Sequence, residues 1–255
     1  MVRGLYTAYT GMLNQQYRMD TITNNLANSA TTGYKKEGAT SQSFDELMIT
    51  KLRDSSEGFW DRRIGQTTLG VKIGENFTDY TQGSLKTTDN TLDVALAGDG
   101  FFEISFKNKA GVESLKYTRD GSFALTKDGW LVTKDGDFVQ GIGGNIQLDT
   151  QAEVRIDTTG RIFENGEVVD QIKVVDFEDY NYLRKYGENM YDPVEGATQK
   201  QADAVLRQGY LEQSNVNVIS EMVELITIAR AYEANQKFIQ TADDTLSKDV
   251  TLGAL

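Results

Sequence analysis

Both ends of this chain carry apolar side chains at alternating steps of three and four residues, and this rhythm constrains the fold more than any other feature. It runs from Leu5 to Leu26, and a longer stretch repeats it from Val218 to Leu246. Such spacing places the apolar side chains on one stripe of an α-helix, as in a heptad seam. The chain is therefore expected to begin and end with amphipathic helices.

The helix boundaries and the charges of the two ends can also be predicted. The first helix is expected to stop near Asn28, because residues 29–33 are poor helix formers ending in a glycine. The second, capped by Asn215 or Asn217, would span about 30 residues and about 45 Å, which favours pairing with another helix. Residues 1–37 hold four basic and two acidic side chains, whereas residues 208–255 hold three basic and seven acidic ones. These opposite charges suit pairing of the two ends, although apolar burial would supply most of the energy.

The middle of the chain has a different pattern, in which short β-prone runs alternate with turn dipeptides. The dipeptides are Asp99-Gly100, Asp120-Gly121, Asp128-Gly129, Asp135-Gly136 and Asn165-Gly166. All of them accept the positive φ angles of tight turns. The runs 122–126, 130–133 and 138–140 predict a β-meander, and residues 171–177 predict a further strand.

Together these patterns predict an α+β fold in which the terminal helices pair as a coiled-coil-like domain. Residues 1–37 would supply its N-terminal helix and residues 208–255 its C-terminal helix. A central, mostly antiparallel β domain is expected over 83–207. Residues 38–82 are interpreted as a connector, with a short helix over residues 44–53.

Composition removes most classes of enzyme and several kinds of partner. The 255 residues include neither Cys nor His, so disulfides, thiolate or imidazole metal sites and His-dependent nucleophiles are excluded. A net charge of −12 disfavours binding to nucleic acid or an anionic membrane surface. No apolar run is long enough to insert in a membrane, and the first residues do not form a signal peptide. If the protein leaves the cytoplasm, it is expected to do so by a route that uses no cleaved signal.

The remaining motifs for chemistry are better explained by structure. Residues 89–93 and 134–137 lack the ligand spacing of a calcium loop, and residues 141–145 lack the Lys-Ser/Thr of a phosphate-binding loop. With 38 Asp and Glu, two acids can lie close together by chance, and none stands out as a glycosidase-type catalyst. We therefore expect no catalytic residue, no metal and no cofactor.

Four motifs occur in order along nearly the whole chain. The N-terminal motif comprises Asn24, Asn25, Leu26, Ala27 and Asn28, followed by residues 32–35, which include Gly33 and Lys35. Central motifs cover residues 92–102 and 117–123. The C-terminal motif begins with residues 209–212, the last of them Glu212, and includes Ser214, Asn215, Val216, Arg230, Tyr232, Glu233 and Asn235. This pattern resembles the bacterial flagellar rod and hook axial proteins, and among them the distal-rod subunit most closely, with the proximal-rod paralogue second.

The resemblance implies a structural subunit that assembles helically with copies of itself and with other rod and hook proteins into the drive shaft that transmits torque. It further implies export through the flagellar type III apparatus, and a location in the basal body outside the cytoplasmic membrane. The terminal helices would form the inner tube, with the β domain outside.

A mechanism follows for the helical ends, which we expect to be only marginally ordered before assembly, because two helices alone bury too little surface. Docking on the growing rod would bury one seam against the other, within a subunit and between neighbours. The N-terminal seam residues are Leu5, Met12, Met19, Ile22 and Leu26, and the C-terminal ones are Met222, Leu225, Ala229, Tyr232 and Ile239.

Two alternatives of other classes make different predictions. A coiled-coil surface adhesin with a β head would form a closed oligomer that does not depend on the flagellar exporter. A carboxylate-based glycan hydrolase would lose cleavage when one particular acid of the β domain is neutralised.

Overall fold

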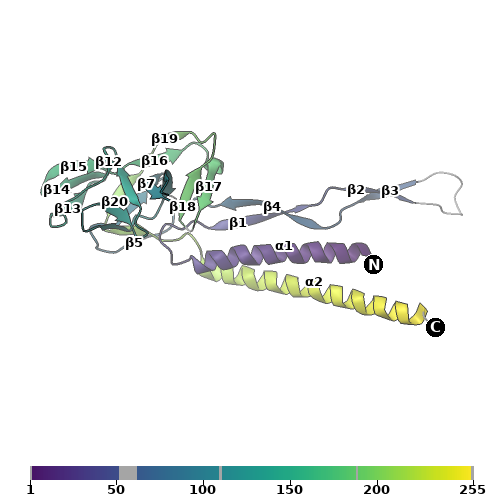
Figure 1. The fold of residues 1–255 in the computed structure, drawn as a ribbon. Coiled ribbons are helices and arrows are strands. Elements are labelled where there is room, and N and C mark those ends of the chain that lie inside the picture. Colours follow the sequence, from purple (N-terminus) through teal and green to yellow (C-terminus); the bar gives the residue numbers. More distant parts are fainter. Residues whose placement is uncertain (1, 52–61, 109–110, 188, 254–255) are drawn as a thin grey trace. The chain divides into compact units, whose positions relative to one another are not determined.

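The computed structural model describes residues 2–51, 62–108, 111–187 and 189–253, and the chain divides into two compact units. Unit 1 comprises residues 1–26, 37–78 and 218–255, and unit 2 comprises residues 27–36 and 79–217. The two long helices, α1 (Val2–Ala27) and α2 (Val218–Gly253), belong to unit 1, where they run antiparallel (Figure 1). The predicted stop of the first helix near Asn28 is thus confirmed. Helix α2 has 36 residues, somewhat more than expected, and Asn217 immediately precedes it.

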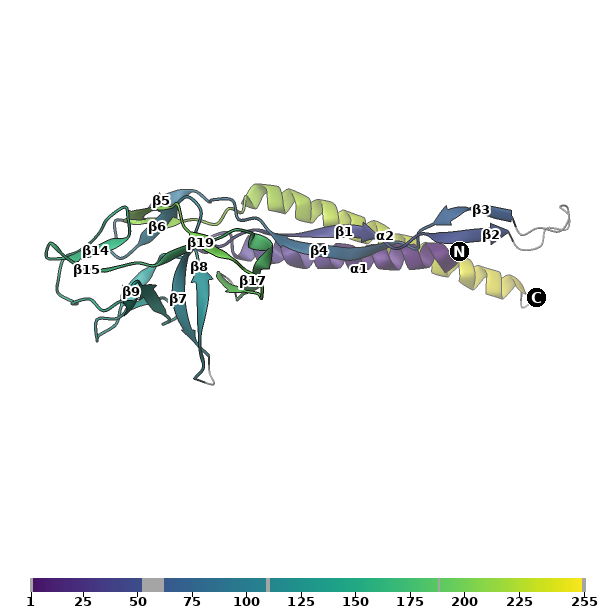
Figure 2. The ribbon, with the colours of Figure 1, turned by 90° about the horizontal axis from the view of Figure 1, so that it is seen from above.

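The rest of unit 1 consists of two antiparallel strand pairs, drawn along the helices in Figure 2. They are β1 (Glu37–Ser43) with β4 (Val71–Thr78), and β2 (Leu47–Lys51) with β3 (Arg62–Thr67). The expected short helix over residues 44–53 is wrong, because residues 47–51 pair with β3 and their backbone hydrogen bonds go to that strand. Residues 52 and 53 lie outside the described residues. The segment interpreted as a connector therefore carries four strands, and the domain boundaries stay a prediction.

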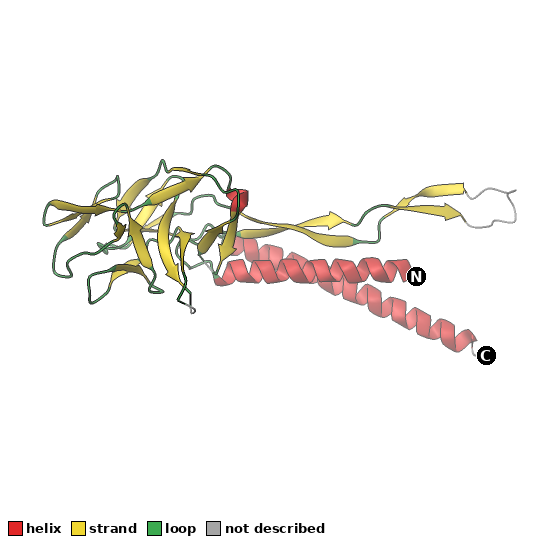
Figure 3. Ribbon diagram, turned by 45° about the horizontal axis from the view of Figure 1, so that its top comes forward, coloured by secondary structure: helices red, strands yellow, loops and turns green. Residues whose placement is uncertain are grey.

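Unit 2 is built from antiparallel strands (Figure 3). Its largest sheet contains β17 (Leu183–Tyr186), β18 (Met190–Pro193), β8 (Glu113–Thr118), β7 (Phe101–Lys107), β11 (Phe138–Gly141), β10 (Leu131–Thr133) and β9 (Phe123–Leu125) in that order, with β12 (Gly144–Asn145) on β11, β16 (Val174–Phe177) on β7, and β19 (Gln199–Gln201) on β16. A three-stranded sheet contains β13 (Val154–Ile156), β14 (Arg161–Glu164) and β15 (Glu167–Gln171). Two pairs are β20 (Val205–Gln208) with β6 (Val94–Ala97), and β21 (Tyr210–Glu212) with β5 (Leu85–Thr87). A short 3-10 helix, η1 (Tyr180–Tyr182), precedes β17. The two terminal helices and the antiparallel β region are confirmed.

The predicted meander is confirmed, since β9, β10 and β11 are consecutive neighbours in the large sheet. The strand expected over residues 171–177 is wrong in its extent. Gln171 ends β15, Ile172 forms a single bridge with Gly141, and β16 starts only at Val174. One uninterrupted strand cannot form here, because the chain passes from the three-stranded sheet to the large one.

Four of the five predicted turn dipeptides hold their glycine at positive φ, and Asn165-Gly166 does so at both residues. Gly121 is the exception. It is needed for close approach instead, because a Cβ atom there would overlap the backbone carbonyl of Val94.

Strand β7 lies between the two apolar clusters that form the core of unit 2. Its first two residues, Phe101 and Phe102, are fully buried and point to opposite faces of the sheet. Phe102 packs with Phe123 in an edge-to-face contact, whereas Phe101 joins a second cluster that includes Tyr191. Burial on both faces makes β7 the centre of a rigid unit.

Candidate assembly surface and the motif residues

Helices α1 and α2 contact each other at positions spaced by seven residues on α1. Gly4 lies against the ring of Phe238, and Gly11 lies against the side chain of Asn235. One and two heptads further on, Arg18 forms an ion pair with Glu224 at 2.9 Å, and Asn25 donates to a Glu221 carboxylate oxygen at 3.3 Å. The spacing matches the heptad rhythm, although continuous coiled-coil packing stays a prediction.

Most of the predicted seam residues are turned away from solvent in the single chain. Ile22 is buried, and eight others are half-buried. These eight are Leu5, Met12, Met19, Leu26, Leu225, Ala229, Tyr232 and Ile239. Met222 differs, because half of its surface is exposed (50%). A role of these ten residues in contacts between subunits stays a prediction.

A second apolar stripe faces solvent on each helix, and of its residues the sequence prediction named only Met222. On α1 it consists of Tyr6, Tyr9 and Leu13, and on α2 of Ile219, Met222, Val223 and Ile226. Ile219 is 76% exposed. The signal was present in the sequence, because these residues repeat the same three-four step beside the first seam. The most buried apolar residue of α2, Ile228, was missed as well.

The N-terminal motif contains an asparagine that closes the turn from α1 into β1. Asn25 is fully buried, and its side-chain oxygen accepts from the backbone N–H of Glu37 at 3.0 Å while its amide donates to the carbonyl of Glu37 at 2.8 Å. Because only a short amide offers a donor and an acceptor at this reach, Asn is required here. Its neighbours Asn24 and Ala27 are exposed.

Further motif residues organise the N-terminal segment of unit 2. Asn28 accepts from the hydroxyl of Thr31 at 3.2 Å. Gly33 has a φ of 68°, and any Cβ there would collide with the backbone of Arg119. Its N–H donates to the carbonyl of Glu212 at 2.9 Å, which joins the two distant motifs. Glycine is therefore required both for its φ and for this close approach.

A buried cluster of charges joins three of the motifs within unit 2. The ammonium of Lys35 lies 2.6 Å from the carboxylate of Glu212, and the guanidinium of Arg119 lies 3.4 Å from it. All three side chains are almost fully buried. Lys35 also donates to the carbonyl of Thr81, and Glu212 accepts from the N–H of Gly83. Burial lowers the pKa of Lys35, and the attraction of Glu212 opposes that effect.

The start of the C-terminal motif is also tied to unit 2. The amide of Asn215 donates to the carbonyl of Asp79 at 2.8 Å, and its oxygen accepts from the N–H of Lys36 at 2.7 Å. Asn215 is therefore not the helix cap, since its side chain is committed to these partners. Ser214 accepts from the N–H of Val216 at 3.3 Å. Further along, Tyr232 and Asn235 are half-buried, and a final pair, Arg230 and Glu233, is exposed on α2.

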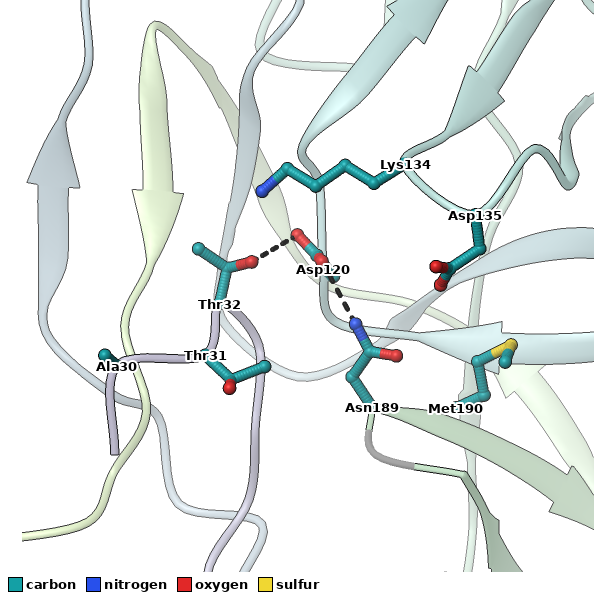
Figure 4. Close-up of a pocket in the computed structure, with 8 residues that line it drawn as sticks. All are labelled: Ala30, Thr31, Thr32, Asp120, Lys134, Asp135, Asn189 and Met190. Atoms are coloured by element: carbon teal, nitrogen blue, oxygen red, sulfur yellow. Dashed lines mark hydrogen bonds between the residues drawn. The ribbon is translucent and has the colours of Figure 1, made fainter. Parts of the chain in front are cut away.

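A pocket of about 410 Å³ in unit 2 is lined by polar side chains (Figure 4). At its base Asp120 accepts from Thr32 at 2.8 Å, from Asn189 at 3.0 Å and from Ser122 at 2.7 Å. These donors occupy the carboxylate oxygens of Asp120, which indicates a structural role. Across the described ranges, no three acidic side chains gather as metal ligands would, and neither described helix is apolar enough over its length to span a membrane.

Comparison with family models places flagellar domains along this arrangement. Residues 5–35 match the flagella basal body rod protein model, and residues 95–164 match the flagellar hook protein FlgE/F/G D1 domain. Residues 207–252 match the flagellar basal body rod FlgEFG protein C-terminal model. The matches include the helices and the motif residues that the structure brings together, and they define an axial protein of the flagellum.

Similarity to curated proteins indicates which kind of flagellar axial protein this chain is. The flagellar basal-body rod protein FlgG of Buchnera aphidicola subsp. Schizaphis graminum is 34% identical, with 97% of this chain and 98% of the relative covered. The FlgG proteins of Borreliella burgdorferi and Bacillus subtilis are 35% and 33% identical, covering 96% and 99% of this chain and 97% and 99% of their own lengths. The chain therefore belongs to the flagellar basal-body rod protein family, and the predicted distal-rod resemblance fits these relatives.

Proposed function

We propose that this rod protein assembles helically with copies of itself into a distal section of the flagellar drive shaft, where it transmits torque. The observation that carries the proposal is the second apolar stripe on α1 and α2. A protein that stays monomeric rarely exposes groups of large apolar side chains such as the one on each of these helices. Side chains such as Tyr6 and Ile219 would be buried between neighbouring subunits. Torque transmission needs many simultaneous contacts and no catalytic residue.

The stripe adds to the predicted seam instead of replacing it. Within one chain most of the ten seam residues are only partly buried, so the exposed part of each side chain is available to neighbours. Met222 belongs to both the seam and the stripe. Because a helical polymer grows through contacts that do not close into a ring, the two surfaces of each helix would meet different neighbours.

The family supports a proposal about partners and location. Relatives are named as basal-body rod proteins, and a 30% identical relative in Bacillus subtilis is named flagellar hook-basal body complex protein FlhO. We propose that this chain contacts other rod and hook proteins, that the flagellar type III apparatus exports it without cleavage of a signal, and that it resides in the basal body outside the cytoplasmic membrane. Ordering of the helices would be completed on docking.

Replacement of Met222 by Glu tests the proposed assembly. The substitution places a charge on a half-exposed side chain, so the monomer should fold normally while polymerisation and motility are lost. Polymerisation is measured by sedimentation of the purified protein and motility by swimming of cells that carry the variant. Met222→Leu keeps the surface apolar and serves as the control, with both activities retained. Motility of the Glu variant at the wild-type level would contradict the proposal.

A further inference from the structure

Two sheets of unit 2 end in strands beside which no further strand is paired among the described residues, although the carbonyl of Gln171 at the end of one of them already accepts from Ile142. Strand β15 is the last strand of the three-stranded sheet, and β17 is the last strand of the large sheet. An open edge presents backbone N–H and C=O groups that can pair with another chain. The side chains on these two edges differ in charge.

The β15 edge is apolar and acidic. Val168 and Val169 are exposed, Val168 to 56%, and both stand between Glu167 and Asp170. Ile142, which is 69% exposed, lies beside them because its N–H donates to the carbonyl of Gln171 at 2.9 Å. Three exposed β-branched side chains at the edge of a sheet form a surface that is usually covered in a stable assembly.

The β17 edge is basic and aromatic. The side chain of Arg184 is 71% exposed, and its nearest acid, Asp192, lies 3.3 Å away. Asp192 is held more closely by Lys116, at 2.7 Å, so the positive charge of Arg184 is only partly compensated. Next to it the ammonium of Lys185 lies over the ring of Tyr34, which keeps a second positive charge at this edge. Tyr182 and Tyr186 are exposed on either side of these residues.

The two edges cannot meet within one molecule, because β15 and β17 lie at opposite ends of unit 2 (Figures 1 and 2). We propose that the β15 edge of one copy pairs with the β17 edge of a second copy, extending both sheets across the contact. The proposal rests on the self-assembly proposed above and names a contact made by unit 2 within that assembly. A contact between two different edges is heterologous and repeats from copy to copy, as an open polymer requires.

Charge selects this pairing over the symmetric ones. Pairing β15 with β15 would set Glu167 and Asp170 of one copy against the same acids of the other, and pairing β17 with β17 would oppose two copies of Arg184. Like charges across a strand pair are destabilising, whereas opposite charges and aromatic contacts with β-branched residues are favourable. Only the mixed pairing brings Glu167 toward Arg184 and the valines toward the tyrosines.

Charge reversal in the full-length protein tests the contact. Glu167→Arg and Arg184→Glu should each raise the critical concentration for polymerisation about tenfold or more, because each opposes like charges at the contact. The double variant restores the opposite charges and should recover most of the loss. Lys127→Glu makes the same change of charge as Arg184→Glu, on an exposed turn, and is the control for that variant. Critical concentrations come from sedimentation, and circular dichroism checks that each variant is folded.

Cross-linking gives an independent measurement, because the chain contains no Cys. A Val168→Cys, Tyr186→Cys double variant, assembled and treated with a short bismaleimide, should form a ladder of oligomers on a denaturing gel. Each single variant should not form a ladder. If the wild-type protein forms filaments but both charge variants polymerise normally, this contact alone would be overturned. The same holds if the wild-type protein forms filaments and the double Cys variant gives no ladder. Failure of the wild-type protein to polymerise would overturn the proposed self-assembly and this contact with it.

Discussion

Unit 1 and unit 2 are stabilised in different ways, although the same chain forms both. In unit 2, apolar side chains close two clusters around β7, and even charged groups such as Lys35 and Glu212 are buried with their partners. Among the described residues of unit 1, few apolar side chains are buried, and a group of large apolar side chains remains exposed on each helix. Unit 2 has the buried core of a stable domain, whereas unit 1 exposes apolar side chains that a further chain could cover.

This difference suits a protein that must be both folded and able to polymerise. Buried apolar area supplies most of the stability of a domain, so unit 2 is expected to be stable alone. The exposed stripe of unit 1 contributes nothing to the stability of the monomer and becomes useful only when another copy covers it. Unit 2 is therefore expected to supply most of the stability of the monomer, and unit 1 the surface for polymerisation. Substitutions in unit 2 should mainly lower the free energy of unfolding, whereas substitutions on the exposed stripe of unit 1 should mainly impair polymerisation.

The largest contrast is expected between Phe102→Ala and Tyr6→Ala. Phe102 is fully buried, so its truncation should lower the free energy of unfolding by about 3–5 kcal/mol. Tyr6 is 60% exposed, so its truncation should change that free energy by less than about 0.5 kcal/mol while impairing polymerisation. Urea unfolding followed by tryptophan fluorescence measures the first effect and sedimentation the second. Equal destabilisation by the two variants would show that the units do not differ in this way.

A second test concerns the buried charge cluster that helps to hold unit 2 together. Glu212→Gln leaves Lys35 and Arg119 buried without their anion, which should cost about 3–5 kcal/mol of stability. Glu113→Gln is the matched control, because its ion pair with Lys107 is exposed and long, at 3.8 Å, and should matter by less than about 1 kcal/mol. Urea unfolding of the two variants side by side gives the comparison.

The dependence on pH sharpens this test. Burial lowers the pKa of Lys35 below its ordinary value, and loss of Glu212 should lower it further. A lysine that binds its proton less tightly in the folded state destabilises the fold while charged, and this cost disappears as the pH rises through the folded pKa toward the ordinary one. The Glu212→Gln variant should therefore regain stability relative to the wild type on raising the pH toward 10. A loss that does not change with pH would instead indicate that the hydrogen bonds of Glu212, and not its charge, hold the cluster.

Much of the architecture could be predicted because it depends on local patterns. The three-four steps determine the helices, Gly33 and the residues before it end the first one, and Asp-Gly dipeptides mark the turns of the meander. Residues 47–51 were predicted incorrectly because pairing with β3, and not local propensity, decides their conformation. The general rule is that patterns within one element are visible in the sequence and pairings between elements are not.

The motif residues illustrate the same limit at the site. Lys35 and Glu212 are 177 residues apart, so nothing in the sequence shows that they form one buried pair. Their places in two separate motifs gave the only signal. The exposed stripe was missed for another reason, because a helix with apolar residues on two adjacent faces does not reveal which face is buried in the monomer. The helix contacts at Gly4 and Gly11 decide this, since glycine allows the helices to approach closely there.

The smallest effect is expected for the ion pair between the two helices. Arg18 and Glu224 are both partly exposed, so Arg18→Ala should lower the free energy of unfolding by only about 0.2–1 kcal/mol. Its effect on local opening of the helices should be larger, because this pair is a polar contact that joins α1 to α2. Hydrogen exchange on the monomer should show faster exchange in α1 and α2 near these residues, with no change in β7. Faster exchange in β7 as well would mean that the helices and the β strands unfold together, and that the two units are not energetically separate.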